Sequence, residues 1–155
     1  MDKPVDNSIQ HISIEDLSEP LTYPTEAFLC PQYAQREQEL LWPKIWQMAG
    51  RVEDIPAPGN YFVYDIADES IIVIRTNAET IKAYYNVCPH RGRQLINSPD
   101  DINCPSGKKA SFVCGFHGWT YDLDGKNTHV LDPDDWKGAL NAERTCLSEL
   151  KVDTW

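Results

Sequence analysis

The chain has 155 residues, of which 41% are hydrophobic and 25% are charged; this is the size and composition of one globular domain and not of a disordered chain. Its formal net charge of −10 argues against binding to nucleic acid or to an anionic membrane, because both need clustered Lys and Arg. No run approaches the roughly 20 apolar residues that cross a bilayer, and the acidic N-terminus resembles neither a secretory signal nor a transit peptide, so we expect a soluble, cytoplasmic protein.

The N-terminal part is predicted to hold one helix. Residues 1–30 are predicted to be an arm, because prolines and polar residues disfavour a packed element there. A helix is predicted from about Pro31 to Met48, since proline suits a first helical turn and apolar residues recur at helical spacing. Pro43 is expected to kink or split this helix. Trp42 and Trp46 are expected to pack in the core.

The rest of the chain is predicted to be mainly β and antiparallel. Runs rich in β-branched and aromatic residues, separated by turn residues, predict strands at 61–66, 70–76, 81–88, 111–114 and 147–155. A hairpin is predicted at 120–130, with its turn at Asp124 and Gly125. Residues 132–144 are predicted to be irregular with one helical turn, and the polar segment 98–109 is predicted to be an exposed loop.

Two loop regions, at about 86–95 and 113–125, each combine one cysteine with one histidine. Thiolate and imidazole together bind zinc or iron–sulfur clusters. Zinc fingers usually pair Cys with Cys and His with His, whereas one of each per loop suits a binuclear centre with two sulfur ligands on one iron and two nitrogen ligands on the other. The sequence therefore predicts a Rieske [2Fe–2S] cluster, with zinc as the alternative, on these four ligands: Cys88, His90, Cys114 and His117.

The residue patterns of the two motifs resemble those of one protein family. CPHRG and CGFHGWTYDLDG are similar to the Rieske motifs C-x-H-R-G and C-x-x-H-G-W-x-Y-[D/N]-x-x-G of aromatic-ring-hydroxylating oxygenases, in their large (alpha) subunits. The likeness covers roughly residues 25–155. It implies a mainly β, antiparallel Rieske-type domain at 31–155, preceded by a helix. It also implies that the following residues surround the ligands: Arg91, Gly92, Gly118, Trp119 and Tyr121.

Departures from a related group predict the redox range. High-potential Rieske proteins join the two loops by a disulfide and place Ser and Tyr hydroxyls on the cluster sulfurs. Arg93 and Phe116 stand here at the cysteine positions, and Trp119 stands at the serine position. Because fewer hydrogen bonds to sulfur stabilise the added electron less, we expect a potential near the low end of the Rieske range of about −150 to +300 mV.

The remaining Cys and His residues limit what this chain does alone. The oxygen chemistry of the family uses a mononuclear iron held by two His and one carboxylate. Only His11 and His129 lie outside the proposed cluster, so we expect that iron, Fe(II), only in a catalytic domain absent from this chain, and no catalytic residue here. Cys30, Cys104 and Cys146 are predicted to be small, partly buried thiols without a functional role.

The resemblance implies an oxidoreductase component that does not hydroxylate substrate by itself. A reductase or ferredoxin would donate the electron, and the catalytic domain of an oxygenase, in the neighbouring subunit of a trimer, would accept it. Aromatic-ring hydroxylation is the reaction that the resemblance implies. A free-standing Rieske ferredoxin is the alternative function, and a structural zinc module for protein interaction is a further one.

Overall fold

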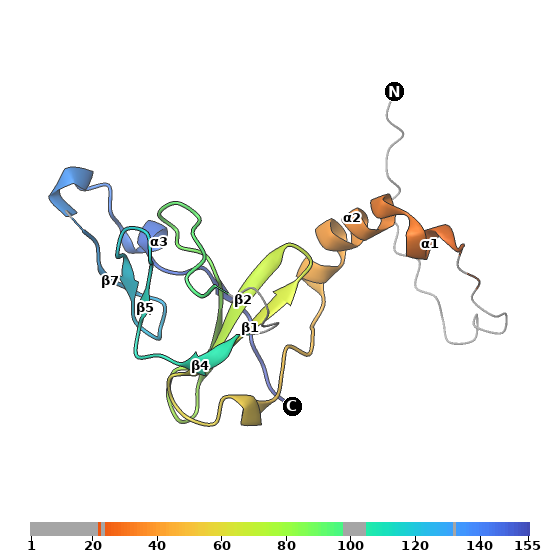
Figure 1. Ribbon diagram of the computed structural model, residues 1–155, viewed down its shortest axis with the longest axis horizontal. Coiled ribbons are helices and arrows are strands. Elements are labelled where there is room, and N and C mark those ends of the chain that lie inside the picture. The colour runs from red at the N-terminus through yellow and green to blue at the C-terminus, as the bar shows by residue number, and fades with distance from the viewer. Residues whose placement is uncertain (1–21, 23, 98–104, 132) are drawn as a thin grey trace. The chain divides into compact units, whose positions relative to one another are not determined.

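A computed structural model describes residues 22, 24–97, 105–131 and 133–155 (Figure 1). The chain divides into two compact units, residues 1–46 and residues 47–155. The predictions for His11 and Cys104 fall outside the described residues. In the part of the chain that is described, no helix is long and apolar enough to cross a membrane.

The first unit contains short helices. Its elements are α1 (Glu26–Leu29), α2 (Pro31–Leu40) and the 3-10 helix η2 (Trp42–Lys44). Pro31 occupies the first turn of α2, as predicted. The predicted extension to Met48 is wrong: α2 ends at Leu40, and Pro43, which has no N–H to donate, lies in η2. The predicted core position of Trp46 is also wrong, since 67% of it is exposed.

The second unit is built on an antiparallel sheet. Its strand order is β4-β1-β2-β3-β8. The strands are β1 (Asn60–Ile66), β2 (Glu69–Arg75), β3 (Ile81–Tyr85), β4 (Ser106–Lys108) and β8 (Glu149–Leu150). β1 and β2 pair with Phe62 opposite Val73 and Ile66 opposite Glu69, and a tight turn at Ala67, with φ of 50°, joins them. The mainly β, antiparallel prediction with a helix on the N-terminal side is confirmed.

A smaller antiparallel sheet carries the second motif. It has the order β5-β6-β7, formed by β5 (Phe112–Val113), β6 (Thr120–Tyr121) and β7 (Asn127–His129), and it lies to one side of β1 and β2 in Figure 1. The predicted hairpin at 120–130 is therefore confirmed. Short helices complete the unit: η3 (Val52–Asp54), η4 (Pro133–Trp136) and α3 (Ala142–Thr145).

Two strand predictions and one loop prediction need correction. The strand predicted at 81–88 ends at Tyr85, because the chain turns there: the N–H of Val87 donates to the carbonyl of Tyr85 at 2.8 Å. The strand predicted at 147–155 covers only Glu149–Leu150. Part of the predicted loop 98–109 is the edge strand β4, which pairs with β1 through backbone hydrogen bonds that need no particular side chain.

The main core lies between the sheet and the two Cys–His loops. Val63, Ile72 and Ile74 from β1 and β2 form its base, each at most 1% exposed. Cys88, Cys114, Trp119 and Tyr121 belong to the same buried cluster. The two motifs are thus attached to the hydrophobic core and do not project from it as free loops.

Candidate metal centre

The first loop, residues 88–93, follows β3 and closes on itself. The N–H of Cys88 donates to the carbonyl of Arg93 at 2.8 Å, and the N–H of Gly92 donates to the carbonyl of Cys88 at 2.9 Å. Gly92 has a φ of 72°, in the left-handed region that favours glycine. These two bonds form a compact turn with Pro89 and His90 at its outer side.

The second loop, residues 114–119, repeats this backbone arrangement between β5 and β6. The N–H of Cys114 donates to the carbonyl of Trp119 at 2.8 Å, and the N–H of Gly118 donates to the carbonyl of Cys114 at 3.0 Å. Gly118 has a φ of 69°. The two loops are therefore copies in backbone, with cysteine and glycine at matching positions, although His117 is one residue further from its cysteine than His90 is.

The structure brings the two cysteines into the core. Cys88 is 1% exposed and Cys114 is 2% exposed. Burial raises the pKa of the Cys88 thiol, although hydrogen bonds from Tyr121 and from the backbone of His90 act in the opposite direction. A thiolate in such surroundings needs a positive partner, which an iron ion would provide.

Tyr121 supplies a hydroxyl that the sequence comparison with high-potential proteins had not assigned. Its Oη lies 3.0 Å from the Sγ of Cys88, and the residue is completely buried. Burial, followed by the bond to Cys88, raises the pKa of Tyr121, so the phenol stays protonated and can donate to sulfur. The sequence predicted fewer hydrogen bonds to sulfur than in high-potential Rieske proteins, and Tyr121 supplies one such hydroxyl beside Cys88.

The two histidines lie side by side at the less buried end of the loops. Their ring centroids are 4.6 Å apart. The Nδ1 of His117 is buried and has no hydrogen-bond partner among the described residues. Such an orphaned nitrogen is costly, and a metal ion bound to it would remove the cost. This observation, with the buried cysteine pair, fits the donor set of a [2Fe–2S] cluster.

The protonation of His90 also suits metal binding. Burial, then the neighbouring His117 and Arg91, lowers its pKa, which favours the neutral ring that coordinates metal. Within the described ranges, no group of three or more His, Cys, Asp and Glu side chains converges on one point as a site for a single ion. The site has instead one pair of thiols and one pair of imidazoles.

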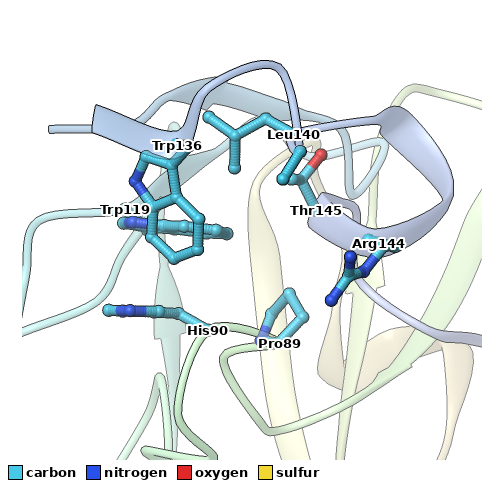
Figure 2. A pocket seen from close by; sticks show the side chains of 8 residues that line it. Pro89, His90, Trp119, Trp136, Leu140, Arg144 and Thr145 are labelled. Carbon is cyan, nitrogen blue, oxygen red and sulfur yellow. The ribbon is translucent and has the colours of Figure 1, made fainter. Parts of the chain in front are cut away.

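An aromatic cavity of about 120 Å³ adjoins His90 (Figure 2). The ring of His90 stacks on Trp119, with centroids 4.8 Å apart and planes at 6° to each other. Trp136 lies across both rings, 5.3 Å from His90 and 5.5 Å from Trp119. Arg144 lines the opposite side, as Figure 2 shows. Trp119 thus comes from the second loop and supports the histidine of the first.

Several other predicted residues are exposed or only partly buried. Arg91 and Arg93 are exposed and form no ion pair within the described part of the chain. His129 is exposed, and Cys30 and Cys146 are partly buried free thiols. Sequence reasoning missed Asn86 and Trp136. A polar residue at the end of the otherwise apolar run IKAYYNVC was the available signal for Asn86.

The chain is similar in sequence to proteins of one known family. The family model described as "Rieske [2Fe-2S] domain" matches residues 45–138. The chloroplastic choline monooxygenase of Beta vulgaris is 33% identical over 135 residues, which is 87% of this chain and 28% of that protein. The carnitine monooxygenase oxygenase subunit of Acinetobacter baumannii is 28% identical over 86% of this chain and 34% of its own length.

Solved structures agree on the fold. A quaternary ammonium Rieske monooxygenase, studied for carnitine oxidation and inter-subunit electron transfer, superposes with a TM-score of 0.75 at 29% identity, over 85% of this chain and 34% of its own. Naphthalene 1,2-dioxygenase with indole bound gives a TM-score of 0.69 at 30% identity, over 78% of this chain and 26% of its own. The chain thus spans about a third, or less, of the length of these relatives.

Proposed function

The chain belongs to the Rieske [2Fe-2S] domain family, and from this premise we propose that it carries one electron at a time through a cluster bound by Cys88, Cys114, His90 and His117. The observation that carries this proposal is the convergence of two equivalent loops. They bring together two buried thiols and, beside them, two imidazoles of which one has an unpartnered nitrogen among the described residues. A [2Fe–2S] cluster bound there would supply one-electron oxidation and reduction.

The residues of the chain divide the work of holding such a group. The buried thiols of Cys88 and Cys114 would anchor it and exclude water from the inner side. The less buried imidazoles of His90 and His117 would connect it to the surface. Redox partners are therefore expected to approach at the histidines, beside the cavity of Trp136 and Arg144.

We assign the chain to the electron-entry part of a Rieske oxygenase. A reductase or ferredoxin would deliver the electron, and an oxygenase catalytic domain with its own mononuclear iron would receive it. The support is that the curated relatives are monooxygenases or their oxygenase subunits, of which this chain corresponds to about a third. A free-standing Rieske ferredoxin is the second candidate, supported by the compact unit that residues 47–155 form.

The substrate class that we propose differs from the aromatic one expected from the motifs. The curated relatives at 28–40% identity are named for choline, glycine betaine and carnitine, all quaternary ammonium compounds. A domain exchange tests this assignment. Residues 24–155 would replace the matching part of a carnitine monooxygenase and of a naphthalene dioxygenase. We expect the carnitine monooxygenase chimera to retain a larger fraction of its parent enzyme's turnover than the dioxygenase chimera. Turnover retained only in the dioxygenase chimera would contradict the assignment.

The first test of electron transfer uses the chain itself. Produced aerobically, it should be red-brown, contain two irons and two sulfides per chain, and take up one electron from dithionite with a rhombic EPR signal. A colourless protein with one zinc would contradict the proposal and support the zinc module. Oxidation of the reduced chain by an oxygenase component that lacks its own Rieske cluster would favour the oxygenase assignment over the ferredoxin.

A further inference from the structure

Asn86 is a fully buried polar residue directly before the first loop. It is 2% exposed and follows the last residue of β3. Its backbone N–H donates to the carbonyl of Ser70 in β2 at 2.8 Å. A buried primary amide needs partners for two N–H groups and for its oxygen, since each group left unpaired is costly.

The side chain of Asn86 forms four hydrogen bonds, which satisfy both N–H groups and the oxygen. The Nδ2 of Asn86 donates to the carbonyl of Ile96 at 2.7 Å and to the Oγ of Ser70 at 3.1 Å. The Oδ1 accepts the N–H of Leu95 at 3.1 Å and the N–H of Ile96 at 2.9 Å. One side chain therefore joins the segment that enters the first loop to the segment that leaves it, and both to β2.

Backbone hydrogen bonds do not tie the first loop itself to a strand. Within the described residues, those of the loop run only between Cys88 and Gly92 and between Cys88 and Arg93. The partners of Asn86 lie in the same buried cluster as the cysteines, because Leu95 and Ile96 are 9% and 6% exposed and pack there. Holding Leu95 and Ile96 in place therefore holds the part of the buried cluster against which Cys88 of the first loop packs.

We propose that Asn86 is the positioning residue of the metal centre: its four side-chain hydrogen bonds close residues 86–96 and hold Cys88 and His90 in register with the second loop. This inference rests on the proposed function, because it concerns the geometry of the cluster ligands. Asn86 itself does not contact the cluster; it acts through the chain on either side of the loop.

The chemistry of the site predicts a graded series of variants. Asn86→Ala leaves two N–H groups and one carbonyl of the buried loop end without partners. Asn86→Asp keeps an acceptor for the two N–H groups but places a carboxylate oxygen against the carbonyl of Ile96. Ser70→Ala removes only one of the four bonds. The effect should therefore decrease from Asn86→Ala through Asn86→Asp to Ser70→Ala.

Asn60→Ala is the matched control. The Oδ1 of Asn60 also fastens a turn, since it accepts the N–H of Ala57 at 3.0 Å. Asn60 begins β1, whereas Ser70 pairs with Asp65 near the other end of that strand. This control removes a comparable asparagine from the same unit without touching either loop.

The experiment measures the cluster in the whole chain. We expect Asn86→Ala to bleach at least about tenfold faster under an iron chelator than the unsubstituted protein. Its reduced form should show broader EPR lines and a shifted reduction potential. Asn86→Asp and Ser70→Ala should follow in decreasing order, and Asn60→Ala should keep the bleaching rate, EPR signal and potential, whatever its melting temperature.

Three outcomes would overturn the inference. One is an Asn86→Ala protein that, like Asn60→Ala, melts earlier but keeps its bleaching rate, EPR signal and potential. If Asn86→Ala does not fold, an unchanged bleaching rate, EPR signal and potential in both Asn86→Asp and Ser70→Ala would also contradict the inference. If the unsubstituted chain holds no cluster, the proposed function fails separately, and amide hydrogen exchange at Leu95 and Ile96 decides. Protection lost in Asn86→Ala but kept in Asn60→Ala supports the closure, and protection kept in both contradicts it.

Discussion

The two loops of the candidate metal centre share a backbone conformation but are held in different ways. In each, the cysteine N–H and carbonyl bond to residues further along the loop, and a glycine with positive φ completes the turn. The second loop lies between β5 and β6, which pair with Phe112 opposite Tyr121 and Val113 opposite Thr120. The first loop has no such paired strands on its two sides within the described residues and is closed by the side chain of Asn86.

This difference shows that the same turn can be held either by backbone pairing, which most side chains allow, or by the side chain of one particular residue. Backbone pairing holds the second loop whatever most of its side chains are. The first loop depends on one amide with four partners, so a single substitution can release it. The equivalent turns nevertheless present their cysteines in one buried cluster. The two loops should therefore respond alike to some substitutions and differently to others.

The largest effect is expected from the cysteines, and it should be the same in both loops. Cys88→Ser and Cys114→Ser each remove one of two buried thiols, and a hydroxyl is a poor ligand for iron–sulfur clusters. Iron analysis of the purified variants should show loss of most of the bound iron in both. Cys30→Ser, in the first unit, is the control and should retain the full iron content. Retention of iron in either loop variant would remove that cysteine from the proposed ligand set.

A large cost in stability is expected at Gly125, in the turn that follows the second loop. Its φ is 76°, and an added Cβ would lie 2.6 Å from the ring of Tyr84. That ring is 1% exposed, and its hydroxyl donates to the carbonyl of Leu123, so it cannot move aside easily. Gly125→Ala should lower the free energy of unfolding by roughly 3 kcal/mol, measured by denaturant titration.

Gly138 gives the matched control for this clash. Its φ of 79° is equally strained for alanine, but an added Cβ would meet nothing within 4 Å. Gly138→Ala should therefore cost only about 1–2 kcal/mol. Equal costs at the two glycines would show that contact between the turn and Tyr84 does not support the second loop.

Equal and smaller effects are expected at the glycines inside the two loops. Gly92 and Gly118 have nearly the same φ, and an added Cβ would meet no neighbour within 4 Å at either position. Alanine at each should cost about 1–2 kcal/mol from backbone strain alone. Unfolding titrations of both variants measure this. Costs that differ by more than about 1 kcal/mol would contradict the equivalence of the two turns.

Tyr121→Phe should affect the cysteine of the first loop through a contact from the second sheet. It removes the hydroxyl 3.0 Å from the Sγ of Cys88. Hydrogen bonds to sulfur favour the reduced form, so the potential should fall, by roughly 40 mV if the bond contributes about 1 kcal/mol more in the reduced state. Voltammetry of the two proteins measures the shift. An unchanged potential would mean that this hydroxyl does not bond to a cluster ligand.

The smallest effect is expected at Lys82, which joins the main sheet to the turn after the second loop. Its Nζ lies 3.4 Å from Asp124 and 3.7 Å from Glu149, whose side chains are more than half exposed. Lys82→Ala should cost less than about 1 kcal/mol, and the difference should shrink in high salt. Unfolding titrations at two salt concentrations test this. A larger, salt-independent cost would indicate that the packing of the Lys82 stem matters more than its charge.

The features that depend on local pattern could be predicted from the sequence. Cys88, His90, Cys114 and His117 stand in motifs whose residue types and spacing are specific enough to indicate the family. The antiparallel β-fold and the hairpin around Gly125 followed from alternating β-formers and turn residues. These features are encoded within a few residues of one another.

Features that depend on distant partners were not predictable. The role of Asn86 appears only when Leu95, Ile96 and Ser70 are next to it. β4 contains Ser, Gly and Lys, which do not favour a strand, and it forms because β1 offers an edge.

The length of the helix was mispredicted for a local reason. It was predicted too long because apolar spacing continued past Pro43, although the proline stops regular hydrogen bonding.

The most direct test of the central claim is pulsed EPR of the dithionite-reduced chain, labelled with ¹⁵N only at histidine. If His90 and His117 are ligands, the spectrum should contain two strong ¹⁵N couplings, and each single His→Ala variant should lose one of them or lose the cluster. A reduced cluster without strong histidine couplings would contradict the account. So would a chain that holds zinc and shows no signal.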